Sequence, residues 1–263
     1  MTASPSEPSG QARGGTSFLR SPRWVVGHVL VAVIVAGCVV AGFWQLDRLH
    51  QRRAANARIE AQLARPPVPL DALLASPSAD AVALAYRRVT AAGTYDVEHE
   101  AVLIGRTLDD QTGNNLLTPL LLSAGDGLVV NRGWVPFAMD QPGVAAARPP
   151  TGTVEVEGVL MPPEKQSAVA RGAVPRTQLA AIDLGPIQAA VPYRLLPVYL
   201  WLQSQVPAQP GQLPRMVPLP ALDEGPHLSY AIQWFTFAAI GIVGYPLLIR
   251  REIRRRRPSE PAG

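Results

Sequence analysis

The sequence predicts a membrane protein of the α+β class, in which two transmembrane helices flank one mostly-β extracytoplasmic domain. Residues 24–44 and residues 230–249 contain no Asp, Glu, Lys or Arg, and each run is long enough to cross a hydrocarbon core of about 30 Å. The sequence between the two runs alternates short apolar stretches with turn-forming residues, which is typical of a β-rich domain.

We expect five segments along the chain. They are a disordered cytoplasmic tail (1–22), transmembrane helix 1 (23–45), an extracytoplasmic β-rich domain with a helical stalk (46–229), transmembrane helix 2 (230–249) and a basic cytoplasmic tail (250–263). The first tail is rich in Ser, Pro and Gly, which is the composition of segments that do not bury enough apolar surface to fold.

The charges beside the second apolar run set the predicted orientation. Six arginines follow it within residues 250–257, whereas Asp223, Glu224 and His227 precede it without any Lys or Arg nearby. The positive-inside rule then places both termini in the cytoplasm of a bacterial cell and the domain outside its plasma membrane. Residues 45–229 carry fifteen basic and seventeen acidic residues, so the charge distribution indicates a lipid bilayer as partner and no nucleic acid.

Two residues inside the first run have a second interpretation. Cys38 ends a Val-Ala-Gly-Cys stretch that resembles a lipoprotein cleavage box, but the apolar run continues beyond it to Trp44, unlike a signal peptide. His28 is ionisable within the run, which makes it a functional candidate. It lies only four residues from Trp24, at the predicted cytoplasmic edge, and we expect a structural role for it.

The segment that follows the first run is rich in helix formers up to Arg65, and Pro66 and Pro67 then stop the helix, so the stalk should continue transmembrane helix 1. Strands are expected at residues 89–95, 101–107, 116–122, 128–134, 153–161 and 198–203, with a hairpin turn at 124–127. One helix is expected within 177–191, interrupted at Gly185 and Pro186. Proline-rich residues 206–226 are expected to form an extended linker, and the strands to close as a small barrel or curled sheet.

No enzyme motif is present in the sequence, and we expect no catalytic activity. The residues whose chemistry suggests a binding site lie at the predicted outer boundary of the membrane. His227, Tyr230 and Trp234 would share one face of a helix, and the first run ends with Trp44 and Gln45, followed by Arg48. A flat apolar ligand with anionic edges would suit this set, with the His as an axial ligand, aromatic rings against the ligand and Arg on its carboxylates. The alternative is an interfacial belt of aromatic residues with a His that caps the helix.

Four stretches resemble the Surfeit locus protein 1 family, whose members assist cytochrome c oxidase assembly. They are residues 42–45 (GFWQ) with Arg48, residues 113–120 (GNNLLTPL), residues 130–136 (VNRGWVP) and residues 227–235 (HLSYAIQWF). They occur in the family's order and with its two-span layout, whereas residues 138–197 show no such motif.

The resemblance implies an assembly factor that binds haem a and helps to deliver it to the oxidase's catalytic subunit, in contact with the enzymes of haem a synthesis. It implies that His227 is an axial ligand of the haem iron and that five further residues contact the haem, namely Trp44, Gln45, Arg48, Tyr230 and Trp234. By the same resemblance, Arg132, Gly133 and Trp134 shape a hairpin or a partner surface.

Other functions remain open at this point. One is a membrane scaffold that holds oxidase subunits without binding haem, and another is a membrane-anchored extracytoplasmic sensor. Copper delivery would need paired thiols, and the chain has only Cys38.

Overall fold

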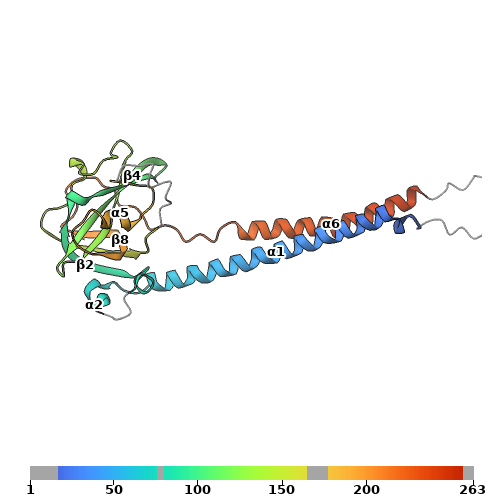
Figure 1. Cartoon of the computed structure of the whole chain (residues 1–263), viewed down its shortest axis with the longest axis horizontal. Coiled ribbons are helices and arrows are strands. Elements are labelled where there is room, and N and C mark those ends of the chain that lie inside the picture. The colour runs from blue at the N-terminus through green and yellow to red at the C-terminus, as the bar shows by residue number, and fades with distance from the viewer. Residues whose placement is uncertain (1–16, 76–79, 165–176, 257–263) are drawn as a thin grey trace, which may run out of the picture. The chain divides into compact units, whose positions relative to one another are not determined.

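The computed structural model describes residues 17–75, 80–164 and 177–256 (Figure 1). The chain divides into two compact units, one made of Met1–Asn56 with Asp223–Gly263 and the other of Ala57–Leu222. The prediction of an α+β chain with an apolar helix near each end and a β-rich domain between them is confirmed. Most of the predicted tail 1–22 and the last seven residues of the predicted tail 250–263 lie outside the described residues.

The first unit contains α1 (Pro22–Leu63) up to Asn56 and the whole of α6 (His227–Arg255). Their most apolar stretches have mean hydropathies of 2.5 and 1.7, so both are long and apolar enough to cross a membrane. Helix α1 continues without a break to Leu63, as the run of helix formers before Pro66 predicts. A short helix, η1 (Ser17–Arg20), precedes it inside the segment predicted to be disordered, and the Phe18 ring packs edge-on against Trp24 there, with ring centroids 5.1 Å apart.

Small residues let α1 and α6 approach each other. A Cβ atom on Gly42 would lie 2.7 Å from the Phe235 ring, which explains why glycine stands at that position. Cys38 and Leu49 on α1 are buried at the spacing of the same helix face, and Ala231 is buried on α6. Close packing of small residues is the usual basis of helix association in lipid, because the hydrophobic effect does not drive helices together there.

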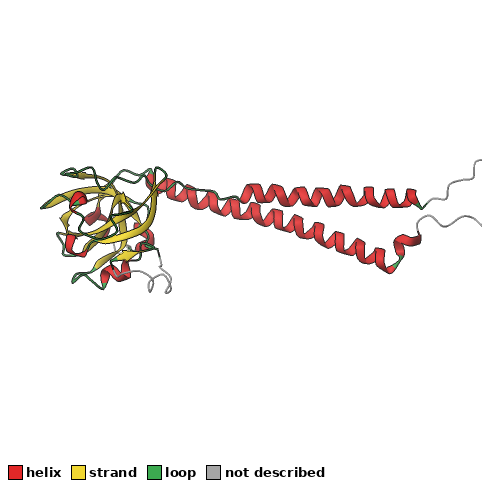
Figure 2. Cartoon of the chain, turned by 90° about the horizontal axis from the view of Figure 1, so that it is seen from above, coloured by secondary structure: helices red, strands yellow, loops and turns green. Residues whose placement is uncertain are grey.

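The second unit contains one eight-stranded sheet, which Figure 2 shows in yellow. Its long strands are β2 (Arg88–Tyr95), β3 (Ala101–Leu108), β4 (Gln111–Leu122), β5 (Gly127–Pro136), β6 (Thr153–Met161) and β8 (Leu195–Val206), joined by the two-residue strands β1 (Val68–Pro69) and β7 (Gln178–Leu179). All six predicted strands are present, and β6 has the predicted bounds.

The sheet closes on itself. The pairings run β2–β6–β8–β5–β4 and return from β4 to β2, and all of them are antiparallel except β5–β8. This closed ring of five strands resembles the small Greek-key barrels of the OB-fold type. The expectation of a small barrel is therefore confirmed.

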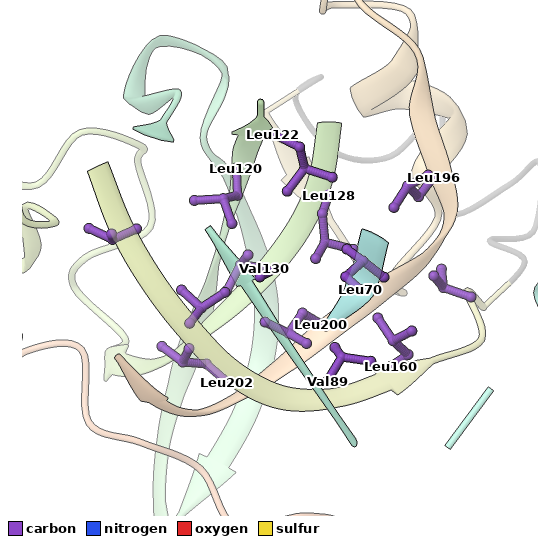
Figure 3. Close-up of a cluster of buried hydrophobic side chains, with 14 of the residues drawn as sticks. Leu70, Val89, Leu120, Leu122, Leu128, Val130, Leu160, Leu196, Leu200 and Leu202 are labelled. Carbon is purple, nitrogen blue, oxygen red and sulfur yellow. The ribbon is translucent and has the colours of Figure 1, made fainter. Parts of the chain in front are cut away.

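The barrel interior holds the main apolar core. Leu120, Leu128, Val130, Leu160 and Leu200 come from the four strands β4, β5, β6 and β8 and point into a common interior (Figure 3). Each has essentially no exposed surface, and burial of such a side chain contributes about 1.5–3 kcal/mol. Buried and exposed residues alternate along β2 and β6, as in strands that turn one face to the interior.

Short helices lie between the strands: α2 (Leu70–Leu74), α3 (Ala81–Leu84), η2 (Val97–His99), η3 (Ala145–Ala147) and α5 (Leu184–Gln188). The helix expected within 177–191 differs from the prediction, because Gly185 and Pro186 lie inside it and do not interrupt it. Asp183 caps α5, and Pro186 falls in the first turn, where the missing N–H has no helical partner to lose.

The segment expected as a linker is bound to the barrel over part of its length. Arg215 exchanges two backbone hydrogen bonds with Trp134, and the indole N–H of Trp201 donates to the carbonyl of Val217 at 2.8 Å. The chain is therefore held on the barrel as far as residue 217, and residues 207–214 contain several bends, so the stretch is not extended throughout.

Candidate functional site

His227 is the first residue of α6, and the residues before it explain why the helix starts there. Gly225 adopts a φ of +73°, a conformation that favours glycine, and its N–H donates to Asp223 Oδ1 at 2.8 Å. Pro226 follows at the N-cap, and the Ser229 hydroxyl donates to its carbonyl at 2.8 Å. The turn thus places the imidazole on the first turn of α6.

The His227 imidazole is held from the other helix. Its Nδ1 lies 2.8 Å from Oε1 of Gln45 on α1. An amide oxygen only accepts hydrogen bonds, so Nδ1 is the donor in this contact, and the neutral form of the ring would have its lone pair on Nε2. A carbonyl partner on one ring nitrogen is the arrangement that orients a histidine whose other nitrogen ligates a metal.

A second contact between the two elements lies just outside the first. The Arg53 guanidinium donates two hydrogen bonds to the Glu224 carboxylate, at 2.8 and 2.9 Å, and the Asn56 amide donates to the Asp223 carbonyl at 3.3 Å. The hydrogen bond from Arg53 lowers the pKa of Glu224. Together these contacts hold the residues just before α6 against α1, so the position of His227 does not depend on Gln45 alone.

A basic hollow of about 420 Å³ lies beside His227. Arg48, Gln51, Arg52 and Ala55 line it together with the imidazole. Arg48 donates to Gln51 Oε1 at 3.1 Å, and its guanidinium lies 5.6 Å from the centroid of the Trp44 ring. The hollow therefore joins two cations and one imidazole, and an exposed indole lies beside one of the cations, which suits an aromatic ligand that carries carboxylates.

The structure brings four of the six predicted site residues into direct contact with one another or with this hollow: His227, Gln45, Arg48 and Trp44. Among the described residues, Tyr230 and Trp234 make no hydrogen bond to this set. Tyr230 is half exposed, and the Trp234 ring packs edge-on against Phe237 at 6.0 Å. Their helical spacing from His227 places both on the same side of α6 as the imidazole.

Sequence reasoning missed Arg52 and the Arg53–Glu224 pair. Arg52 follows Arg48 by four residues, the spacing at which residues of a helix share a face. Because the stalk was predicted to be helical, this spacing could have indicated that Arg52 lies beside Arg48. The pair with Glu224 joins residues 171 positions apart, and no local pattern indicates it.

The donor set limits what this site can hold. The described residues contain no group of three or more His, Cys, Asp or Glu able to hold a metal ion. A single imidazole is enough, however, for a ligand that brings its own metal coordination, such as a porphyrin. The residues thus fit a metalloporphyrin with acidic substituents better than a free metal ion.

His28 and Cys38 have structural surroundings in the first unit. The His28 Nε2 lies 3.2 Å from the Leu19 carbonyl, and its Nδ1 lies 2.5 Å from the Tyr245 hydroxyl. Both ring nitrogens are thus occupied, which agrees with the structural role expected for His28. Cys38 is buried within α1.

The two remaining motif stretches shape the barrel. A Cβ on Gly113 would lie 2.2 Å from the Val135 carbonyl, and one on Gly133 (φ +129°) would lie 2.2 Å from the Arg215 carbonyl. Asn114 is fully buried, and its amide donates to the carbonyl of Phe137 at 3.2 Å. Gly113 is therefore required where β4 packs against β5, Gly133 where the segment around Arg215 crosses β5, and Asn114 holds the segment that follows β5.

Comparisons with known proteins point in one direction. A sequence model described as the SURF1 family matches residues 32–239. A SURF1-like protein of Mycobacterium tuberculosis (strain ATCC 25618 / H37Rv) is 30% identical over 255 residues, which cover 94% of this chain and 90% of that protein. A SURF1-like protein of Monosiga brevicollis is 28% identical over 95% of this chain and 94% of its own length. A third, from Rickettsia bellii (strain RML369-C), is 26% identical over 84% of this chain and 89% of its own length.

Proposed function

The chain belongs to the SURF1 family, and from this premise we propose that it is an assembly factor for cytochrome c oxidase that binds haem a and passes it to the catalytic subunit. Membership itself implies a role in cytochrome c oxidase assembly. The haem is cargo in this proposal, and the protein carries out no catalytic turnover on it. Contact with the enzymes of haem a synthesis would supply the cargo.

The proposal includes a position in the membrane. Helices α1 and α6 would span the plasma membrane of a bacterial cell, with both termini in the cytoplasm and the barrel outside. The arginines at the end of α6 and the acidic residues before its start support this orientation. His227 and Gln45 would then lie at the outer boundary of the bilayer. An apolar porphyrin with polar edges would reach these two residues from within the bilayer.

The pairing of His227 with Gln45 is the observation that carries the proposal. It occupies Nδ1 and leaves Nε2 as the ring nitrogen without a protein partner, through which the neutral form of the imidazole would ligate iron. Arg48 and Arg52 in the adjoining hollow would bind the haem carboxylates, and the Trp44 ring would pack against the macrocycle. Bound haem would supply an iron centre that accepts one nitrogen ligand from the protein and is released when another ligand replaces it.

The test is co-expression of the full chain with the haem a synthesis enzymes, followed by purification and an absorption spectrum. We expect a haem a spectrum from the wild-type protein and a lost or shifted one from His227→Ala. His50→Ala is the matched control, because His50 is an exposed histidine on α1, and its spectrum should equal that of the wild type.

Two results would count against the proposal. An unchanged spectrum in His227→Ala would remove this residue from the site. Purified protein without pigment that still co-purifies with oxidase subunits would instead favour a scaffold without haem.

A further inference from the structure

A second charged surface lies on the last turns of α6, in the same unit but far along the helix from His227. After Ile249 the helix carries Arg250, Arg251, Arg254 and Arg255, and Arg256 follows as its C-cap. Glu252 is the one acidic residue within 250–256. The surface is therefore strongly basic.

Glu252 neutralises only one side of this surface. Its carboxylate accepts a hydrogen bond from Arg256 at 2.6 Å and lies 3.4 Å from Arg255 Nε. The Arg256 guanidinium also lies 4.3 Å from the centroid of the Phe18 ring, which belongs to η1. These two arginines thus have partners within the unit.

The other three arginines have none among the described residues. Arg250, Arg251 and Arg254 make no ion pair in the described part of the chain, and Arg254 is a helical neighbour of both others. Like charges at this spacing repel each other. The negative end of the helix dipole amounts to about half an elementary charge, which is too little to offset three cations.

The direction in which these three side chains leave the helix is fixed by Tyr245. At 100° per residue, Arg250, Arg254 and Arg251 lie roughly 140°, 180° and 240° around the helix from Tyr245. The Tyr245 hydroxyl is bound to His28 Nδ1 at 2.5 Å, and the two rings pack edge-on with centroids 5.7 Å apart. Because Tyr245 faces α1, the three arginines point away from the helix pair.

We propose that Arg250, Arg251 and Arg254 form a binding site for the phosphate of an anionic phospholipid in the inner leaflet. The proposal rests on the membrane position of α6 proposed above and does not depend on haem binding. Guanidinium groups bind phosphate oxygens through paired hydrogen bonds, and a bound phosphate would relieve the repulsion among the three cations.

The depth of the arginines selects a lipid as the ligand. Tyr245 is an aromatic residue of the type that lies at membrane interfaces, and Arg250 follows it by five residues, a rise of about 7–8 Å along the helix. That distance carries the guanidinium groups from the edge of the hydrocarbon region to the headgroup phosphates. A phosphate at this depth beside an apolar helix belongs to a lipid.

The experiment uses the full-length, haem-free protein in nanodiscs of phosphatidylcholine with a minor fraction of phosphatidylglycerol. Lipid that stays with the protein after detergent extraction and washing is quantified by mass spectrometry. We expect phosphatidylglycerol to be enriched over its bulk fraction. Each arginine near an anionic surface is worth roughly fivefold in binding, so the triple variant R250Q/R251Q/R254Q should lose at least about tenfold of this enrichment.

The matched control removes the same charge elsewhere. Arg58, Arg65 and Arg148 are exposed and make no ion pair among the described residues, so R58Q/R65Q/R148Q should keep the wild-type enrichment. If the triple variant does not fold, Arg254→Gln alone should lose roughly fivefold, because this residue neighbours both others.

The proposal would be overturned by wild-type protein without phosphatidylglycerol enrichment, or by equal enrichment in all variants. Equal losses in both triple variants would also overturn it, since they would show attraction by net charge alone. Because the protein carries no haem in this assay, none of these results bears on whether His227 binds haem.

Discussion

The buried ion pair of the barrel gives the sharpest prediction about stability. The Glu100 side chain is almost wholly buried and accepts three hydrogen bonds, from the Thr118 hydroxyl at 2.6 Å, from Arg132 Nη1 at 3.0 Å and from the Gly143 N–H at 3.0 Å. Every one of these donors would lose its charged acceptor in Glu100→Gln, although the shape of the side chain is kept.

Arg132 would then be a buried cation without its counter-charge. Its guanidinium also donates to the Ala147 carbonyl at 2.7 Å and to Gln209 Oε1 at 3.1 Å, and it lies 5.3 Å from the centroid of the Tyr95 ring. Burial lowers the pKa of Arg132, and the charge of Glu100 acts against this effect. Removal of the Glu100 charge therefore leaves the free-energy cost of burying the Arg132 guanidinium without compensation.

The loss of one partner from a buried pair costs about 3–5 kcal/mol. For a domain of this size, 1 kcal/mol corresponds to about 2–4 °C, so the Tm of the barrel should fall by roughly 6–20 °C. Thermal unfolding of the full chain in detergent, followed by tryptophan fluorescence, measures this shift through Trp134 and Trp201.

The control variant is Asp126→Asn, which breaks an exposed pair in the same barrel. Arg194 lies 2.8 Å from this carboxylate, and its side chain is 75% exposed, so the expected loss is below about 1 kcal/mol. A fall in Tm for Glu100→Gln no larger than that of Asp126→Asn would refute the reasoning.

Three further predictions concern the helix pair and the barrel. Gln45→Ala removes the carbonyl that orients the imidazole and should weaken haem binding about 10–100-fold in a titration. Gly42→Leu drives a side chain into the aromatic ring packed on this glycine, so bound haem should be lost while the barrel keeps its Tm. The pKa of Asp96 is lowered: burial raises it, but hydrogen bonds from Tyr193 and His99 outweigh this effect. The Asp96 carboxylate therefore stabilises the fold above about pH 4, and this contribution is lost as the pH falls further. Asp96→Asn should flatten that acid limb in denaturant titrations at successive pH values.

Each of these predictions has a control with a similar change in an open position. Gln233 is an exposed glutamine on α6, and its change to Ala should leave haem affinity unaltered. Gly37 on α1 has nothing within 4 Å of an added Cβ, so Gly37→Leu should keep the haem. Asp71 is exposed, and Asp71→Asn should leave the acid limb in place. Equal effects in test and control variants would contradict the contacts on which the predictions are built.

The sequence predicted the long elements well because their patterns are local. In β6, buried Val154 and Val156 alternate with more exposed glutamates, and the expected strand matched its bounds. The two-residue strands were missed; β1, for example, joins the sheet only through Val68 and Pro69, which pair with Val89 and Thr90. Such a short pairing is decided by the tertiary fold and leaves no periodicity in the sequence.

The candidate site was predictable in its residue types but not in its contacts. Aromatic residues, His227 and arginines at the ends of apolar runs can be read directly, and the family motifs single them out. The hydrogen bond between Gln45 and His227 joins residues 182 positions apart, and it depends on how α1 and α6 pack. The same holds for the closure of the barrel between β2 and β4, which no local pattern indicates.

The most direct test of the central claim is the haem a content of cytochrome c oxidase in membranes from a strain that lacks this protein. We predict that the deletion lowers the haem a content of the oxidase and that the wild-type chain restores it. His227→Ala, present at the same level in the membrane, should fail to restore it, whereas His50→Ala should succeed. Full restoration by His227→Ala would contradict the account, because it would show that the protein supports the oxidase without a haem ligand at this position.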